Sequence, residues 1–324
     1  MGRGVSRYGI VDRNTPITTS VKETAGGLPA VISAWKHGVS KMGFVGSTVS
    51  LGRANQKRGF DCPGCAWPDP KHRSPFEYCE NGAKAVSDEA TIKTIPDSFW
   101  QEHSIHALGR KSDQWLNSQG RLSRPLILER DSNHYVPSDW DRAIGIIAKS
   151  LDALEDPNDA YFYTSGRASN EAAYLWQLLA RQYGTNNLPD CSNMCHESSG
   201  VALNESIGIG KGTVRLEDFD KADLIVIVGQ NPGTNHPRML SALKSAKKSG
   251  ASVLSINPLK ETGMRRFRHP QSPIDMLGAG TQISDDHVNI KINGDMALFR
   301  AIGSIILDKG SHDLDFINQH DGLS

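Results

Sequence analysis

The most constraining feature of this 324-residue chain is the placement of its five cysteines, which lie in only two short segments. Cys62 and Cys65 form a Cys-x-x-Cys pair, and Cys79 follows after thirteen residues. Cys191 and Cys195 lie far along the chain. Thiols clustered in this way, in a chain with no secretion signal, predict metal or redox chemistry rather than disulfides. Because most such metal sites have four ligands, the first segment leaves one ligand to be found.

The composition excludes several classes of partner. Lysine plus arginine equals aspartate plus glutamate, at 36 residues each, so no basic surface for nucleic acid is expected. No apolar run is long enough for a transmembrane segment, and the N-terminus lacks the apolar core of a signal peptide. We therefore expect a cytoplasmic protein.

The chain divides into three predicted regions: an N-terminal extension (1–59), the cysteine region with short strands (60–136), and an α/β domain (137–324). In the last, helical periodicity alternates with short apolar runs, which predicts a doubly wound parallel sheet. A helix is expected from Ser138 as its N-cap. In this domain we predict helices over 138–154, 171–184, 197–207 and 238–250. We predict strands over 160–164, 223–229 and 251–258.

Loops rich in glycine and asparagine follow the predicted strands. In doubly wound folds, ligands lie at the carboxyl ends of the strands, and such loops suit a nucleotide with a pyrophosphate. No G-x-G-x-x-G or Walker A motif accompanies them, and each residue alone is equally well explained by turn geometry. The candidate residues are Gly166, Arg167, Asn170, Gly229, Asn231, Asn235 and Asn257.

Cys195 and His196 lie directly before a predicted helix over 197–207. A helix N-terminus lowers the pKa of a thiol, so Cys195 could serve as a nucleophile or as a soft metal ligand. The neighbouring His196 could accept a proton. An inert buried cysteine fits these residues equally well.

Several motifs together resemble a known family. The stretches "CPGCAWPDP", "YTSGRASNEA", "MCHESSGVAL", "GQNPGTNHPRM", "INP" and "INGDMAL" are similar to those of the molybdopterin oxidoreductase superfamily, in its formate-dehydrogenase-like branch (FdhF/YdeP-type). Catalytic subunits of this superfamily are considerably longer than 324 residues. The resemblance therefore implies the N-terminal portion of such a subunit, in a chain that we expect to be truncated.

The resemblance implies a role for each of these segments. Cys195 would ligate the molybdenum of a bis(molybdopterin guanine dinucleotide) cofactor, and His196 would accept a proton. Lys84 would lie between this cofactor and an iron–sulfur cluster, and electrons would leave to a partner protein. Besides the strand-end residues above, the dinucleotide would contact Pro232, His236, Gly294 and Asp295.

The resemblance also implies a [4Fe–4S] cluster in the first cysteine segment. In the family pattern, three residues separate the Cys-x-x-Cys pair from a further cysteine, but Asp69 stands at that position in this chain. We therefore expect Cys62, Cys65, Asp69 and Cys79 as ligands, with His72 as the rival of Asp69. Two alternatives remain: a zinc-ribbon joined to a nucleotide-binding domain, and a molybdenum-free electron-transfer or scaffold module of the same fold.

Overall fold

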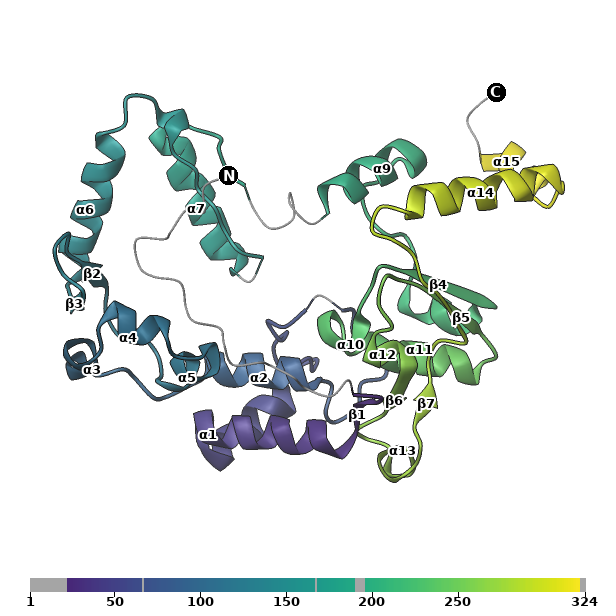
Figure 1. The fold of residues 1–324 in the computed structure, drawn as a ribbon, viewed down its shortest axis with the longest axis horizontal. Coiled ribbons are helices and arrows are strands. Elements are labelled where there is room, and N and C mark those ends of the chain that lie inside the picture. The colour runs from purple at the N-terminus through teal and green to yellow at the C-terminus, as the bar shows by residue number, and fades with distance from the viewer. Residues whose placement is uncertain (1–21, 66, 167, 190–195, 321–324) are drawn as a thin grey trace. The chain divides into compact units, whose positions relative to one another are not determined.

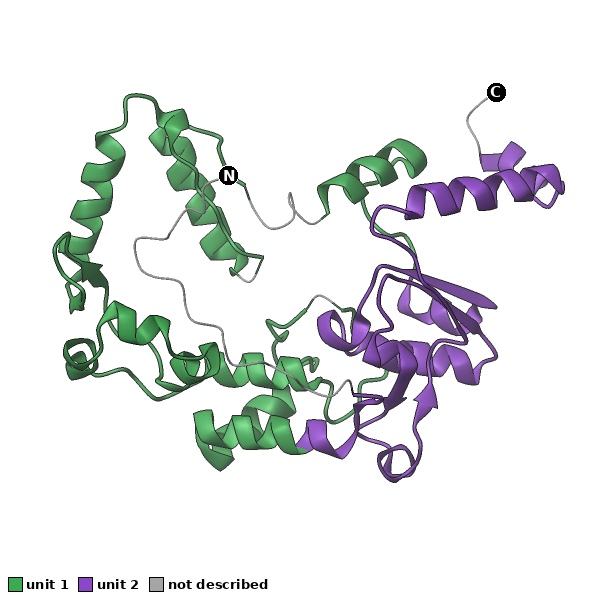
Figure 2. Cartoon of the chain, in the orientation of Figure 1, with its two compact units in different colours: residues 1–20, 32–214 green, residues 21–31, 215–324 purple. Residues whose placement is uncertain are grey.

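The computed structural model describes residues 22–65, 67–166, 168–189 and 196–320 (Figure 1). The chain forms two compact units (Figure 2). Unit 1 contains residues 32–214, and unit 2 contains residues 21–31 and 215–324, with residues 1–20 grouped with unit 1. Both helices and strands are present, so the expected mixed α/β class is confirmed.

Unit 1 is mainly helical. A hairpin pairs β2 (Leu126–Leu128) with β3 (Tyr135–Pro137) in antiparallel register, at the two runs where short strands were expected. The helices of this unit are α1 (Gly27–Arg53, which begins in unit 2), α2 (Glu80–Glu89), α3 (Asp97–Glu102), α4 (Ile105–Gly109), α5 (Asp113–Ser118), α6 (Trp140–Asp152), η1 (Pro157–Asp159), α7 (Asn170–Tyr183) and α9 (Glu197–Ile207).

The segment expected to be an irregular extension contains the long helix α1. Gly43 has φ 73° and ψ 174°, so the helix is broken there into two pieces. Glycine adopts this conformation without a Cβ clash. Both pieces pack on α2 through a small core of Ala34, Leu51, Cys62, Ala83 and Val86. This core therefore fixes α2, which follows Cys79, against the preceding chain.

Unit 2 is built on a three-stranded parallel sheet with the order β4 (Leu224–Val228), β5 (Ser252–Ile256), β8 (Asp286–Val288). Helix α11 (Met239–Lys248) connects β4 to β5, and its buried Leu240 and Leu243 pack on the sheet with Ile227 and Val253. A second small sheet joins β1 (Ala25–Gly26), β6 (Arg266–Arg268) and β7 (Thr281–Gln282). The remaining helices are η2 (Leu216–Lys221), α10 (Pro232–Asn235), α12 (Thr262–Arg265), α13 (Pro273–Leu277), α14 (Asp295–Asp308) and α15 (Leu314–His320).

Two local predictions are wrong. Residues 160–164 form no strand in the described chain; Phe162 instead donates its backbone N–H to the carbonyl of Asn187 at 2.9 Å. These residues belong to unit 1, so they do not extend the parallel sheet of unit 2. The N-cap of α6 is Asp139, whose carboxylate accepts the N–H of Arg142, rather than the buried Ser138. A longer acceptor at the next residue completes the cap equally well.

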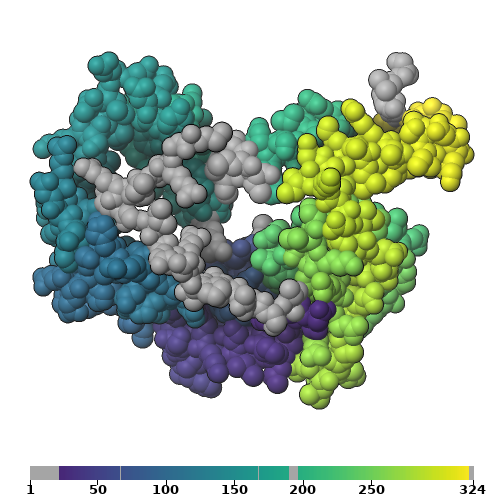
Figure 3. Space-filling view, viewed as in Figure 1, coloured from purple at the N-terminus to yellow at the C-terminus, as the bar shows by residue number. Residues whose placement is uncertain are grey.

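Helix α14 exposes much of its apolar surface, including Met296, Phe299 and Ile305 (yellow in Figure 3). This helix follows β8 and begins at Asp295. No helix in the described part of the chain is both long and apolar enough to cross a membrane.

Candidate functional site

The first candidate site lies at the beginning of α2. Cys79 is the N-cap of this helix, with extended φ and ψ, and its Sγ accepts the backbone N–H of Gly82 at 3.3 Å. A sulfur in this position receives a hydrogen bond and faces the positive end of the helix dipole. Both features stabilise negative charge on the sulfur, and the thiolate is the form that binds metals.

Gly82 brings two of the cysteines together. A Cβ built on Gly82 would lie 3.1 Å from Sγ of Cys62 and 3.6 Å from Sγ of Cys79. Both sulfurs therefore lie against one backbone position. The loop between Cys62 and Cys65 also approaches here, because a Cβ on Gly64 would lie 3.3 Å from Cα of Gly82.

The thiols also interact electrostatically. Burial raises the pKa of Cys79, and the negative charges of the Cys65 and Cys62 thiolates raise it further, whereas the N–H groups of Gly82 and Asn81 lower it. Because its pKa is raised, Cys79 needs a nearby cation to be held as a thiolate. The arrangement is thus suited to a metal centre.

Asn55 holds this site together and was not among the predicted residues. Its side-chain oxygen accepts the N–H of Cys62 at 2.9 Å, and its amide nitrogen donates to the carbonyl of Glu77 at 2.7 Å. Asn55 is 4% exposed and has φ 56°, a conformation that asparagine tolerates better than most residues. One side chain thus ties the Cys-x-x-Cys segment to the chain that enters Cys79.

The structure does not bring a fourth ligand to the thiols. Asp69 forms an ion pair with Arg73 at 3.0 Å, and His72 is exposed. No group of three or more His, Cys, Asp or Glu side chains in the described residues has the geometry to hold a single metal ion. A [4Fe–4S] cluster spreads its thiolates over several iron atoms, so that its ligands lie farther apart than those around one ion. The role of Asp69 stays a prediction.

Lys84 lies on α2, one turn after the cysteine cap. Its Nζ forms an ion pair with Glu80 at 2.7 Å, and both side chains are about one-third exposed. The pair orients the lysine along the helix surface next to Cys79. The ion pair with Glu80 does not test whether Lys84 contacts a pterin, so that role stays a prediction.

The second candidate site is the carboxyl edge of the parallel sheet in unit 2. Gly229 follows β4 with φ 66°, and its N–H donates to the carbonyl of Ile256 at 2.9 Å. Asn257, 5% exposed, follows β5 and donates to the carbonyl of Gln230 at 3.2 Å. The two strand ends are therefore fixed to each other by the residue types that the sequence singled out.

The next turns of these loops also meet. Asn231 is the N-cap residue of α10, and its amide donates to the carboxylate of Glu261 at 2.8 Å. A Cβ on Gly263 would lie 2.8 Å from Cα of Gly233, so α10 and α12 approach backbone to backbone. Glycine at both positions permits this contact, as in loops that must remain close to a ligand. Pro232, Asn235 and His236 lie in or directly after α10.

The loop after β8 completes the edge. Asn289, which was not predicted, donates to the carbonyl of Pro258 at 2.8 Å. Gly294 is the N-cap residue of α14 and Asp295 its first residue, and no side chain caps this helix. Free N–H groups at a helix start are suited to an anionic group. Asn289 follows β8 as Asn257 follows β5, but the Asp-His-Val sequence of β8 is no apolar run that would mark a strand.

The remaining predicted residues are not brought to this edge. Gly166 and Asn170 belong to unit 1, where Asn170 begins α7 behind the N-cap Ser169. The prediction that strands 160–164, 223–228 and 252–256 are neighbours in one sheet is therefore wrong for the first of them. Their loops were grouped because all three follow apolar runs, and the sequence does not show which runs pair.

Arg167, Cys191 and Cys195 lie outside the described residues. His196 is exposed and is the N-cap residue of α9, a helix that agrees with the predicted range of 197–207. Gly208 ends this helix as a left-handed C-cap with φ 76°. The role of Cys195 stays a prediction.

Comparison with known proteins establishes the family. Residues 121–315 match the family described as molybdopterin oxidoreductase. The chain belongs to this family. An uncharacterized oxidoreductase of Mycobacterium tuberculosis is 51% identical over 306 residues, and protein YdeP of Escherichia coli is 47% identical over 291 residues. These alignments cover 92% and 90% of this chain.

The chain spans 39% and 38% of the length of these two relatives. A protein of Staphylococcus aureus provisionally named a formate dehydrogenase is 28% identical over 77% of this chain and 24% of its own length. Among solved structures, acetylene hydratase from Pelobacter acetylenicus has a TM-score of 0.46 at 18% identity, over 60% of this chain and 25% of that one. The family match, over residues 121–315, includes parts of both units.

Proposed function

We propose that this chain is part of a molybdenum-dependent oxidoreductase resembling formate dehydrogenase, which oxidises or reduces a small substrate by two electrons. When bound, a molybdenum bis(molybdopterin guanine dinucleotide) supplies the two-electron centre, and a [4Fe–4S] cluster passes electrons on to a partner protein. The proposal rests on family membership and, in particular, on the thiols that meet at the start of α2.

The thiol site fits a cluster in its donor set and its surroundings. Cys62, Cys65 and Cys79 would supply three thiolates, which are the ligands that iron–sulfur clusters prefer. The N–H of Gly82 donates to Sγ of Cys79, and hydrogen bonds to cluster sulfurs tune the reduction potential. The fourth ligand would be Asp69, released from Arg73, or His72.

The sheet edge fits the dinucleotide through its loops. Gly229, Asn231 and Asn257 fix the ends of β4 and β5, and the uncapped start of α14 at Gly294 and Asp295 offers N–H groups to a phosphate. Pro232, Asn235 and His236 would contact the same ligand from α10. In unit 1, Gly166, Arg167 and Asn170 would contact another part of the cofactor, and Lys84 would do so beside the cluster.

Cys195 and His196 would carry the chemistry of the substrate. Cys195 precedes α9, whose positive dipole end favours a thiolate that ligates molybdenum. The exposed imidazole of His196 can accept the proton released when a substrate is oxidised.

The thiol site can be tested without the molybdenum cofactor. The 324-residue chain is reconstituted with iron and sulfide under anaerobic conditions, and iron content and the visible absorbance of the cluster are measured. We expect iron–sulfur absorbance in the wild type and its loss in Cys62→Ser and Cys79→Ser, with Cys191→Ser as the matched control. Binding of one zinc ion without iron–sulfur absorbance would instead favour the zinc-ribbon alternative.

Molybdenum content of the complete protein tests the second half of the proposal. Cys195→Ser should keep the iron–sulfur absorbance and abolish turnover, because an alkoxide is a harder ligand than a thiolate. A complete protein that contains the cluster but no molybdenum would support the electron-transfer or scaffold alternative. A milder effect of Cys195→Ser than of Cys191→Ser would contradict the assignment.

A further inference from the structure

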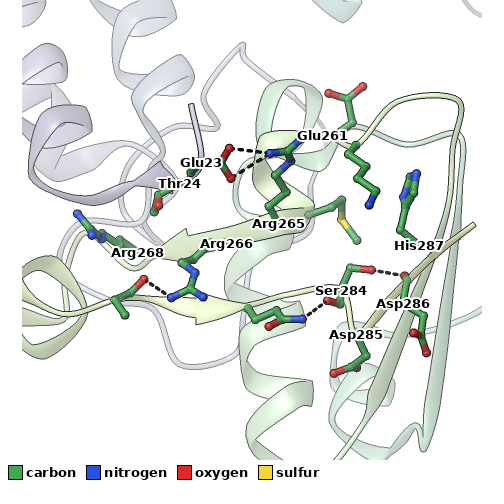
Figure 4. Close-up of a pocket in the computed structure, with 14 residues that line it drawn as sticks. Glu23, Thr24, Glu261, Arg265, Arg266, Arg268, Ser284, Asp285, Asp286 and His287 are labelled. Atoms are coloured by element: carbon green, nitrogen blue, oxygen red, sulfur yellow. Dashed lines mark hydrogen bonds and ion pairs between the residues drawn. The ribbon is translucent and has the colours of Figure 1, made fainter. Parts of the chain in front are cut away.

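A charged cavity of about 790 Å³ lies beside the edge strand β8 in unit 2 (Figure 4). It is lined by the segment after β5, by the β6–β7 hairpin, by the beginning of β8 and by Glu23 and Thr24. None of the residues assigned to the dinucleotide lines it. The cavity reaches β8 at Asp286 and His287, where the strand begins, whereas the dinucleotide edge is at the strand ends. The cavity adjoins that edge through the loop after β5, because Glu261, which lines the cavity, accepts the amide of Asn231.

One corner of this cavity contains buried nitrogen atoms without a hydrogen-bond partner. Nε of Arg265 and Nε2 of His287 are both inaccessible to solvent and unpaired in the described structure. Buried polar atoms in proteins are ordinarily paired, and an unpaired one indicates a missing water or ligand. Nε of Arg268, another lining residue, is also buried without a partner, and three such nitrogens in one cavity indicate a group that offers acceptor oxygens.

The acidic residues of the cavity are largely engaged elsewhere. Glu23 accepts Nη1 of Arg265 at 2.8 and 2.9 Å, and Figure 4 shows this pair at the far side of the arginine from His287. Asp285 accepts Nζ of Lys247, which lies outside the cavity, and the N–H of Val253. Glu261 accepts the amide of Asn231. These carboxylates therefore do not neutralise the corner near His287.

The basic residues leave this corner positive. Lys260 makes no ion pair in the described part of the chain. Burial lowers the pKa of His287, and the positive charges of Lys260 and Arg265 lower it further. The imidazole thus lies in the field of two cations, with Asp286 as the nearest carboxylate along its own strand. An anion placed here would offset that field.

We propose that this corner binds the phosphate or carboxylate group of an anionic small molecule through Lys260, Arg265 and His287. The oxyanion would accept hydrogen bonds from the two buried nitrogens and an ionic contact from the lysine. The rest of the cavity has room for the remainder of such a molecule, and Ser284 and Asp286 offer polar contacts to it. This site does not depend on the proposed redox function.

Isothermal titration of the 324-residue chain with pyrophosphate and, separately, with citrate tests the site and distinguishes phosphate from carboxylate ligands. Lys260→Gln and His287→Gln should each weaken binding about tenfold, since each removes one charged or buried contact. Because Lys260 is exposed, Lys260→Gln should fold normally. It therefore still tests the site if His287→Gln fails to fold. Arg300→Gln, an exposed arginine on α14, is the matched control and should bind like the wild type.

A result in which neither probe binds would overturn the proposal. Equal weakening by Arg300→Gln would also overturn it, because the binding would then reflect net charge alone. Asn235→Ala separates this cavity from the dinucleotide edge. If Asn235→Ala weakens pyrophosphate binding while Lys260→Gln does not, the anion belongs to the sheet edge and this proposal is wrong.

Discussion

The thiol site and the sheet edge each contain a closely packed glycine. Gly82 lies against cysteine sulfurs, whereas Gly263 lies against backbone atoms. At the start of α2, a Cβ on Gly82 would meet the sulfurs of Cys62 and Cys79. At the sheet edge, a Cβ on Gly263 would meet the backbone of Gly233 at 2.8 Å. The first glycine leaves room for functional atoms, whereas the second allows two chain segments to pack. The same substitution should therefore affect ligand binding in one place and stability in the other.

The largest effect is expected for Gly82→Ala on cluster content. The new methyl group would lie 3.1 Å from Sγ of Cys62, so the two sulfurs must move apart. Alanine is a better helix former than glycine, which offsets the cost in folding free energy. After anaerobic reconstitution, iron and sulfide content should fall sharply while circular dichroism stays unchanged.

Gly52→Ala, in the same unit, is the matched control for this change. A Cβ on Gly52 would meet no atom within 4 Å. It should keep full iron content. Wild-type cluster content in Gly82→Ala would show that the sulfurs do not need this position, and the comparison of the two glycines would fail.

The second effect is a loss of stability in Gly263→Ala. Here the methyl group meets backbone atoms, which cannot rotate away, so we expect a loss of about 3 kcal/mol, the upper end for overpacking. All six tryptophans and all seven tyrosines lie outside unit 2, so their fluorescence reports on unit 1 alone. The loss should therefore appear as faster amide exchange in β5 with unchanged tryptophan fluorescence.

Gly303→Ala on α14 is the corresponding control, since its Cβ would meet no atom within 4 Å. It should leave exchange in β5 unchanged. Unaltered exchange in Gly263→Ala would mean that α10 and α12 can separate without cost, which would weaken their role in fixing the sheet edge.

The sequence predicts the two sites unequally. The helices over 171–184 and 197–207 and the paired strands near 224 and 252 follow from periodicity and are confirmed. The strand predicted over 160–164 is wrong, because an apolar run indicates burial but not which neighbour it pairs with. The thiol site has a similar limit. Spacing identifies its cysteines, but the contacts of Asn55 and Gly82 span segments that only the fold brings together.

Asn55→Gly tests how strongly the thiol site depends on that buried amide. Glycine accepts φ 56°, so the change removes the side-chain hydrogen bonds without straining the backbone. It leaves the N–H of Cys62 and the carbonyl of Glu77 unpaired, and we expect a loss of about 2 kcal/mol. Urea unfolding followed by tryptophan fluorescence measures it, with Asn133→Gly as the matched surface control. A loss equal to that of the control would show that water replaces the amide.

The smallest effect concerns Asp88, which anchors the other end of α2. His37 donates to its carboxylate at 2.8 Å, and Lys41, 9% exposed, lies 3.4 Å from it. Burial opposes ionisation of Asp88, but hydrogen bonds from His37 and Asn117 and the charges of His37 and Lys41 hold its pKa below the ordinary value. A lowered pKa means that the ionised form stabilises the folded chain.

This contribution should be present above the ordinary aspartate pKa of about 4 and should disappear as the pH falls through the lowered pKa. Asp88→Asn should therefore be less stable than the wild type at pH 7, by at most about 1 kcal/mol because the carboxylate is one-third exposed. The difference should vanish in strong acid. Glu129→Gln, which breaks a half-exposed pair with Arg142, should show little change at either pH. A difference between Asp88→Asn and the wild type that persists in acid would mean that shape, rather than charge, anchors α2.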